Sequence, residues 1–171
     1  RRHSFCPQKF AYPLKAMIAT LLQGVLGDRC YDAWDYVEGP WKEKPIPELG
    51  GVTARRMMQT LGTEWGRTMD PDFWVRALSA VLNACVHGRI VVDDMRFPNE
   101  YDMLKRRGAI MVRIDRPTDH EEGTLAPHAS EGALDQHHFD HVIVNSGSRE
   151  ELLAKVDALA NIILSTPERH Y

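Results

Sequence analysis

The chain has 171 residues, enough to bury a hydrophobic core in one domain, and its 26% of charged residues is ordinary for a globular protein. Its formal charge of −3 lacks the basic excess of a protein that coats nucleic acid, but it does not exclude an anionic small ligand. No apolar run of membrane-spanning length and no secretory signal is visible. The three cysteines show no CxxC spacing, so we expect a reduced, intracellular protein in the cytoplasm.

The first helix is expected after a polar, irregular segment over residues 1–9. Pro13 suits a first helical turn, because the N–H that proline lacks would have no partner there. Apolar residues repeat at steps of three and four over Leu14–Val25, and Gly27 can end the helix in a left-handed conformation. Lys15 lies off this apolar stripe and is either a phosphate ligand or a solvated side chain.

The segment over residues 28–52 has the least regular pattern, with several prolines and glycines, as in loops that are functional or mobile. Thr53 has the properties of an N-cap for the helix that follows it. The two glycines of Gly62–Arg67 are expected to break that helical pattern. Asp70 is then expected to cap a further helix, which ends before Gly88.

A short β-branched run, Ile90–Val92, has the length and composition of a buried strand. Asp93 and Asp94 follow at its carboxyl end, and Arg96 comes two residues later. Open α/β sheets bind ligands beyond the carboxyl ends of their strands, where carboxylates serve a metal ion and guanidinium groups serve an anion. The alternative is that these charges only end the strand in solvent.

The rest of the chain alternates helix and strand. A helix after Asn99 ends at Gly108, and residues 109–114 form the next expected strand, which favours a parallel βαβ unit. A third strand is expected at Val142–Val144, and Ser148 begins a terminal helix with capping-box spacing. The residues of this helix expected to face the core are Leu152, Val156, Leu159, Ile162 and Ile163. The pattern predicts an α/β fold with a parallel sheet covered on both faces.

Arginine is the residue type that points most strongly to a ligand. Guanidinium groups match phosphate oxygens two at a time, and phosphoryl transfer requires mainly positioning and charge neutralisation. For any single arginine, a surface ion pair is an equal alternative. The arginines at helix-adjacent or strand-end positions are Arg55, Arg56, Arg67, Arg76, Arg96, Arg113 and Arg116. The late histidines lack zinc-site spacing, and the sequence contains no GxxxxGK[ST] loop.

Several segments together resemble the bacteriophage deoxynucleoside monophosphate kinases, in order over nearly the whole chain. The most specific are GTEWGR at residues 62–67 and DDMRFPNE at residues 93–100. The other matching segments are FAYPLK at 10–15, RRMMQTL at 55–61, DFWVR at 72–76, RIDRP at 113–117, HASE at 128–131, LD at 134–135 and DHVIVN at 140–145. The late part of this pattern is also similar to the animal type of phosphomevalonate kinase.

The resemblance implies an α/β fold with a three-layer, P-loop kinase-like parallel sheet and helices on both faces, in a single domain over residues 1–171. It implies transfer of the γ-phosphate of ATP to a deoxynucleoside 5′-monophosphate, with Mg²⁺. An acceptor-binding helical region is expected at about residues 28–88 and a lid-like segment at about residues 115–138.

The resemblance also assigns roles to residues. Asp93, Asp94, Arg96 and Arg116 are expected to be catalytic, with Asp93 as the metal ligand. The residues expected to bind substrate are Lys15, Arg55, Gln59, Glu64, Trp65, Arg67, Trp74, Arg76 and Arg113. The expected partners are therefore small molecules, ATP and a deoxynucleoside monophosphate, without stable binding to nucleic acid or membrane; a homodimer is compatible with this reading.

The family's first strand and Walker A loop are expected before Arg1 and are missing from this chain. Either the printed sequence omits a segment, or the chain is a fragment with little kinase activity, because the backbone amides and lysine of that loop hold the donor phosphates. Two alternatives stay open. One is a kinase with phosphomevalonate or a modified base as acceptor, and the other is a non-catalytic nucleotide-binding domain without a P-loop.

Overall fold

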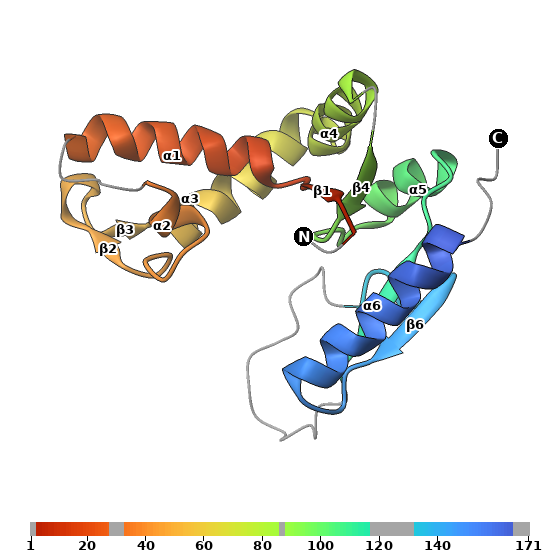
Figure 1. The fold of residues 1–171 in the computed structure, drawn as a ribbon. Coiled ribbons are helices and arrows are strands. Elements are labelled where there is room, and N and C mark those ends of the chain that lie inside the picture. The colour runs from red at the N-terminus through yellow and green to blue at the C-terminus, as the bar shows by residue number, and fades with distance from the viewer. Residues whose placement is uncertain (1–2, 28–32, 86–87, 117–131, 166–171) are drawn as a thin grey trace. The chain divides into compact units, whose positions relative to one another are not determined.

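The structure is a computed structural model that describes residues 3–27, 33–85, 88–116 and 132–165 (Figure 1). The chain divides into two compact units, one of Ser4–Met95 and one of Arg96–Tyr171 together with Arg1–His3. Both contain helices and short parallel strands, which confirms the mixed α/β class. The single domain over residues 1–171 stays a prediction. Among the described residues, no helix has both the length and the apolar character needed to cross a membrane.

The N-terminal unit begins with a strand that the sequence analysis did not predict. Strand β1 covers Phe5–Gln8 and pairs in parallel with β4, which covers Arg89–Val92. The prediction of an irregular segment over residues 1–9 was therefore wrong for these four positions. Their sequence, FCPQ, has neither a β-branched run nor an alternating pattern, so β1 depends on its pairing with β4 rather than on its own propensity.

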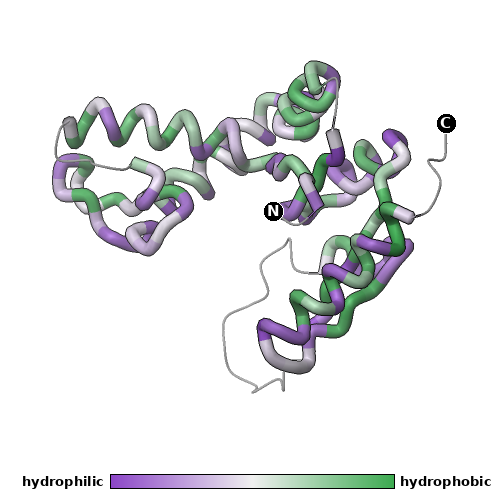
Figure 2. The backbone as a smooth tube through the Cα atoms, viewed as in Figure 1, coloured by the Kyte–Doolittle hydropathy of each residue, from purple (hydrophilic) through white to green (hydrophobic). Residues whose placement is uncertain are grey.

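Helix α1, Tyr12–Leu26, is confirmed as the first long helix, with Pro13 in its first turn. Its apolar side contributes Leu14, Ile18 and Leu22 to the core, while polar residues alternate with them along the helix (Figure 2). Gly27 follows with a φ of 56°, a backbone conformation that glycine adopts without steric cost.

A small hairpin and short helices lie between α1 and the next helix. They are α2 at Trp34–Val37, β2 at Pro45–Ile46, the 3₁₀ turn η2 at Pro47–Leu49 and β3 at Val52–Thr53. Strands β2 and β3 pair in antiparallel orientation. The core of this unit joins α1 and α2 to the buried side chains of Ile46, Ala54 and Trp74.

Helix α3, Ala54–Gln59, starts at the predicted cap, because the Thr53 side chain accepts a hydrogen bond from the Arg56 N–H at 3.2 Å. The predicted break at Gly62–Arg67 was wrong. The helix continues there as η3, a π-helix over Thr60–Arg67. Glycines lower helix propensity, but Gly66 also permits the close packing against Trp74 described below.

Helix α4 covers Phe73–Ala84, and Asp72 rather than the predicted Asp70 is its cap position. Asp70 lies two residues earlier, where its Oδ1 accepts from the Asp72 N–H at 2.9 Å. Asp70 therefore stabilises the turn before the helix instead of the first helical turn. The buried residues of α4 are Trp74, Val75 and Leu78, whereas Val81 is exposed.

The C-terminal unit contains α5 at Pro98–Arg106, β5 at Val112–Asp115, β6 at His141–Val144 and α6 at Arg149–Ser165. Strands β5 and β6 pair in parallel, with Ile114 opposite Ile143. The two predicted strands of the βαβ unit, β4 and β5, thus find their partners in β1 and β6 respectively, in separate two-stranded sheets. Most of the expected lid-like segment, residues 117–131, lies outside the described residues.

Helix α6 starts as predicted, since the Ser148 Oγ accepts from the Glu151 N–H at 3.2 Å. Its predicted buried face is only partly covered. Val156 and Ile162 are exposed, and the helix has no fully buried residue. The 3.6-residue period therefore located the helix but did not indicate how much of its apolar side is covered.

Candidate functional site

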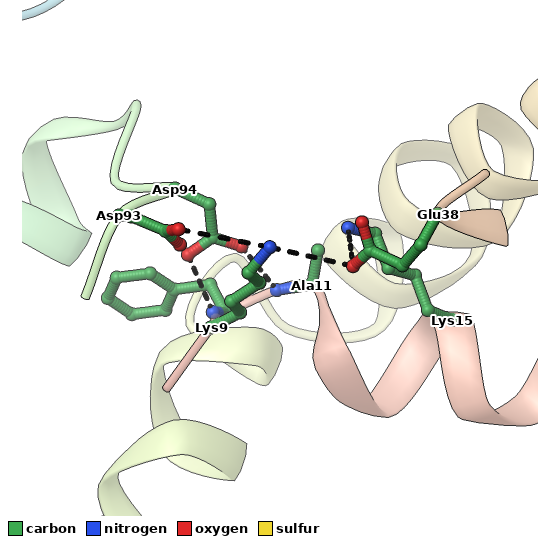
Figure 3. A network of polar contacts seen from close by, with 7 residues as sticks. Lys9, Ala11, Lys15, Glu38, Asp93 and Asp94 are labelled. Carbon is green, nitrogen blue, oxygen red and sulfur yellow. Dashed lines mark hydrogen bonds and ion pairs between the residues drawn. The ribbon is translucent and has the colours of Figure 1, made fainter. Parts of the chain in front are cut away.

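The two carboxylates after β4 have different surroundings (Figure 3). Asp94 is half-buried, and its Oδ1 and Oδ2 accept hydrogen bonds of 2.9 Å each from the backbone N–H groups of Phe10 and Ala11. The Asp93 side chain is 56% exposed, and the Nζ of Lys9 lies 3.9 Å from its Oδ2. Asp94 is therefore engaged by the backbone, whereas Asp93 is open to solvent.

The position of Asp94 follows from the strand pairing. Because β1 and β4 are parallel, with Gln8 opposite Val92, the residues after each strand leave the sheet at the same edge. Ala11 occupies the cap position of α1 but has no side-chain acceptor, and the first turn of α1 contains no acidic residue. Asp94 supplies the negatively charged acceptor that the start of this helix lacks.

Two lysines meet one carboxylate beside this turn. The Oε1 of Glu38 lies 2.7 Å from the Nζ of Lys15 and 3.6 Å from the Nζ of Lys9. Lys9 therefore lies between Glu38 and Asp93, as the dashed lines in Figure 3 show. The Lys15 side chain is only 13% exposed, so its amine is held in place rather than free in solvent.

Glu38 is ionised in this network. Burial raises the pKa of its carboxyl, but the hydrogen bond from Lys15 and the positive charges of Lys15, Lys9 and Lys42 outweigh burial, so the pKa lies below its ordinary value. Lys15 was predicted to bind substrate, and the structure pairs it with this carboxylate. An anionic ligand would reach Lys15 only by sharing or replacing Glu38.

The donor set at Asp93 fits Mg²⁺ of the kind that substrates help to bind. Mg²⁺ often takes one or two protein carboxylates and completes its shell with water and phosphate oxygens. Among the described residues, no three His, Cys, Asp or Glu side chains gather as a metal cage. The open carboxylate of Asp93 can supply one ligand, and the remaining ligands would come from substrate and water.

Aromatic side chains of η3 and α4 form a second cluster in this unit. Trp74 is 3% exposed, and its indole N–H donates to the Gly62 carbonyl at 2.8 Å. Trp65 and Phe73 pack edge to face, with ring centroids 5.3 Å apart, and the Trp65 ring remains partly exposed. Of the two predicted substrate-binding tryptophans, Trp65 is exposed and Trp74 is part of the core.

The predicted polar residues of the acceptor region are exposed or half-buried and mostly paired with nearby acids. Arg55 pairs with Glu43, and Arg76 Nε lies 2.7 Å from Asp70 Oδ2. The remaining contacts are Arg56 with Glu64 at 3.9 Å and Arg67 Nη1 with the Pro71 carbonyl at 3.4 Å. Gln59 is exposed on α3. Exposed ion pairs of this kind contribute little stability, so a ligand phosphate can compete for these arginines at low cost.

Arg96 belongs to the C-terminal unit, at the start of the turn into α5. Its side chain is exposed, while its backbone N–H donates to Glu100 Oε2 at 2.7 Å. The same oxygen accepts from the Phe97 N–H at 3.1 Å, and Glu100 is buried. Glu100 thus fixes the backbone from which the Arg96 guanidinium projects.

Arg113 and Arg116 lie in and just after β5. Arg113 pairs with Asp115 and with Asp135, the latter at 3.2 Å, and these two carboxylates raise the pKa of its guanidinium. Arg116 is exposed. The structure therefore presents Arg113 as part of an ion-pair cluster and Arg116 as a side chain in solvent.

The sequence analysis missed Lys9 and Glu38. Lys9 directly precedes the FAYPLK segment, and its place next to a segment that carries the resemblance was the available signal. Glu38 lies in the irregular segment over residues 28–52, and no local pattern identifies it. Its contact with two lysines is set by the packing of α2 against α1.

Comparison with known proteins identifies the family. The profile of the family described as deoxynucleotide monophosphate kinase matches residues 46–156. A protein of Acanthamoeba polyphaga mimivirus, provisionally given the same name, is 30% identical over 91% of this chain and 82% of its own length. The deoxynucleotide monophosphate kinase of Enterobacteria phage T4 is 32% identical, and the deoxynucleoside-5′-monophosphate kinase of Escherichia phage T5 is 26% identical. These alignments cover 61% and 55% of this chain, and 44% and 40% of the phage proteins.

The fold and the site together define a mixed α/β protein with an acidic turn at the end of a parallel strand and cationic side chains beside it. The chain belongs to the deoxynucleotide monophosphate kinase family. The resemblance inferred from the sequence segments is thereby confirmed.

Proposed function

We propose that the protein is a phosphotransferase that moves the γ-phosphate of ATP to a deoxynucleoside 5′-monophosphate, giving the diphosphate for DNA synthesis. The observation that carries this proposal is the family match over residues 46–156, which includes the turn at Asp93. The relationship to the mimivirus protein along most of the chain supports it. ATP, Mg²⁺ and action in the cytoplasm of a host cell are part of the same proposal.

The proposal extends to the fold, a three-layer P-loop kinase-like sheet with helices on both faces. The parallel pairings of β1 with β4 and of β5 with β6 support it, because parallel strands occur mainly in sheets whose two faces are covered by helices. The helical region over residues 28–88 would bind the acceptor, and residues 115–138 would form the lid.

Phosphoryl transfer requires little covalent chemistry from the protein. The acceptor phosphate is already ionised, so no strong general base is needed. Asp93 would hold Mg²⁺, which when bound neutralises charge on the phosphate oxygens. The guanidinium groups of Arg96 and Arg116 would donate N–H bonds to the transferred phosphoryl group and stabilise the charge that spreads over its oxygens.

The acceptor would bind along α3, η3 and α4. The exposed side chain of Trp65 would stack on the base, and Arg55 and Arg76 would exchange their carboxylate partners for the acceptor phosphate. Trp74 would support the site from the core. The other residues assigned to substrate binding are Lys15, Gln59, Glu64, Arg67 and Arg113.

The test is acceptor profiling of the purified protein. We expect deoxynucleoside diphosphate to form when ATP, MgCl₂ and each of the four deoxynucleoside monophosphates are supplied separately, with the products resolved by ion-exchange chromatography. Phosphate transfer to phosphomevalonate but to no deoxynucleotide would contradict the proposal. Thermal stabilisation by the nucleotides without any product would instead support the non-catalytic alternative.

A further inference from the structure

The adjacent carboxylates Asp93 and Asp94 differ in how far their oxygens are already occupied by contacts within the protein. Both oxygens of Asp94 are used by backbone N–H groups, at 2.9 Å from Phe10 and 2.9 Å from Ala11. Asp93 has one long ion pair, 3.9 Å to the Nζ of Lys9, and is more than half exposed. A carboxylate that gave up its two amide contacts to bind a cation would leave two N–H groups near the start of α1 without their acceptors.

We propose that Asp94 is a positioning residue that fixes the turn between β1 and α1, and that Asp93 alone of the pair contacts the metal and phosphates. This inference rests on the proposed function for the role of Asp93. For Asp94 it rests on geometry, because that carboxylate joins the end of β4 to the two residues that precede α1. The resemblance had suggested a catalytic role for both.

The turn that Asp94 fixes also positions the two lysines of the site. Lys9 is the residue directly before Phe10, and its Nζ lies between Glu38 at 3.6 Å and Asp93 at 3.9 Å. Lys15 projects from the first turns of the helix that follows and contacts Glu38 at 2.7 Å. Holding Phe10 and Ala11 therefore sets where both ammonium groups lie relative to Asp93. Asp94 acts on the site through this turn, without contact to the reacting atoms.

The experiment compares Asp94→Asn with Asp93→Asn, because each removes one negative charge at neighbouring positions. In Asp94→Asn the side chain keeps one acceptor, so one of the two N–H groups faces an NH₂ donor. We expect hydrogen exchange at Phe10 and Ala11 to rise about tenfold in Asp94→Asn and to stay unchanged in Asp93→Asn. Equal exchange in the two variants would overturn the positioning role.

A second readout uses Mn²⁺ alone as the probe, followed by the broadening of NMR signals from residues near the turn. Asp93→Asn should abolish the broadening, whereas Asp94→Asn should keep it. The reverse result would overturn the division of roles. Neither readout needs turnover. If the wild-type protein shows no kinase activity while the two variants give the expected exchange and broadening, the result counts against the proposed function and not against this inference.

Kinetics separate positioning from simple structural support. In Asp93→Asn the Mg²⁺ concentration for half-maximal rate should rise at least about tenfold, on the scale of losing a group that tunes a metal site. In Asp94→Asn kcat should fall while that Mg²⁺ concentration stays unchanged. If Asp94→Asn does not fold, Asp94→Ser retains an oxygen acceptor of the cap type, and the same exchange and Mg²⁺ measurements apply to it. A raised Mg²⁺ requirement in Asp94→Ser would contradict the inference.

Discussion

Gly66 lies so close to the indole of Trp74 that a Cβ added at Gly66 would be 2.6 Å from Trp74 Nε1. The ring cannot move away easily, because it is buried and its N–H is bound to the Gly62 carbonyl. The π-helix η3 brings Gly62 and Gly66 to the same side chain. Packing against Trp74 therefore explains why residue 66 of the GTEWGR segment is a glycine, whatever ligand the neighbouring residues bind.

We predict that Gly66→Ala destabilises the protein by about 1–3 kcal/mol, the usual cost of adding a methyl group to a filled core. Urea unfolding followed by tryptophan fluorescence measures this change. The matched control is Gly24→Ala in α1, where an added Cβ meets nothing within 4 Å. That variant should gain about 0.5–1 kcal/mol, because alanine favours the helix. Equal effects of the two substitutions would contradict the packing argument.

A second prediction concerns the indole N–H. Trp74→Phe keeps most of the buried aromatic area but removes the 2.8 Å hydrogen bond to Gly62. We expect a loss of about 1 kcal/mol or more, since the Gly62 carbonyl loses its indole donor. Trp65→Phe is the control, because Trp65 is partly exposed and only its ring packing is altered. A larger loss in Trp65→Phe would show that ring packing outweighs the hydrogen bond.

The sequence predicted the helices better than the strands. Pro13, Thr53 and Ser148 are local signals, and the helices that they mark start as expected. Strand β1 was missed because FCPQ becomes a strand only by pairing with β4, a partner more than eighty residues away in the chain. The π-helix was missed for a related reason, because its two glycines favour a break until Trp74 packs against Gly66 and donates to the Gly62 carbonyl.

The candidate site was predictable by residue type but not by role. The acidic pair after Ile90–Val92 was located from the strand pattern, but the resemblance placed both aspartates among the catalytic residues. What separates them is the contact of Asp94 with Phe10 and Ala11, which the pairing of β1 with β4 makes. The contact of Glu38 with Lys9 and Lys15 likewise depends on packing and is invisible in any short window of the sequence.

A third prediction concerns the stability of the protein at acidic pH. Burial raises the pKa of Asp140, but the N–H of Met111 at 2.7 Å, the ammonium of Lys105 at 3.0 Å and the charge of His138 outweigh it, so the pKa lies below its ordinary value. A carboxyl with a depressed folded-state pKa stabilises the protein fully above its unfolded pKa, about 4, and loses that contribution as the pH falls through the folded value.

We therefore expect the stability of the wild-type protein to fall below about pH 4 more steeply than that of Asp140→Asn. Thermal unfolding between pH 7 and pH 3 measures the difference. Lys105→Met should remove only part of the dependence, because the Met111 N–H still contacts the carboxylate. The Glu38 carboxyl acts in the same direction, so Asp140→Asn should keep some acid sensitivity. Identical pH profiles for Asp140→Asn and the wild type would contradict this account.

The last prediction tests the proposed phosphate contact of Arg96. Its backbone is fixed by Glu100, which accepts from the Arg96 N–H at 2.7 Å, while its guanidinium is exposed and available to a ligand. We expect Arg96→Ala to reduce phosphoryl transfer at least about 10²-fold, the scale of losing one preorganised charge-stabilising group. Its thermal stability should be unchanged, because the backbone contact remains.

The control is Arg106→Ala, at the other end of α5. It removes an exposed arginine that donates a hydrogen bond to the Asp102 carbonyl at 3.2 Å, and it should leave the rate unchanged. Undiminished turnover in a stable Arg96→Ala protein would end the assignment of Arg96 to the transferred phosphate, and an equal loss in both variants would point to net charge rather than to a specific contact.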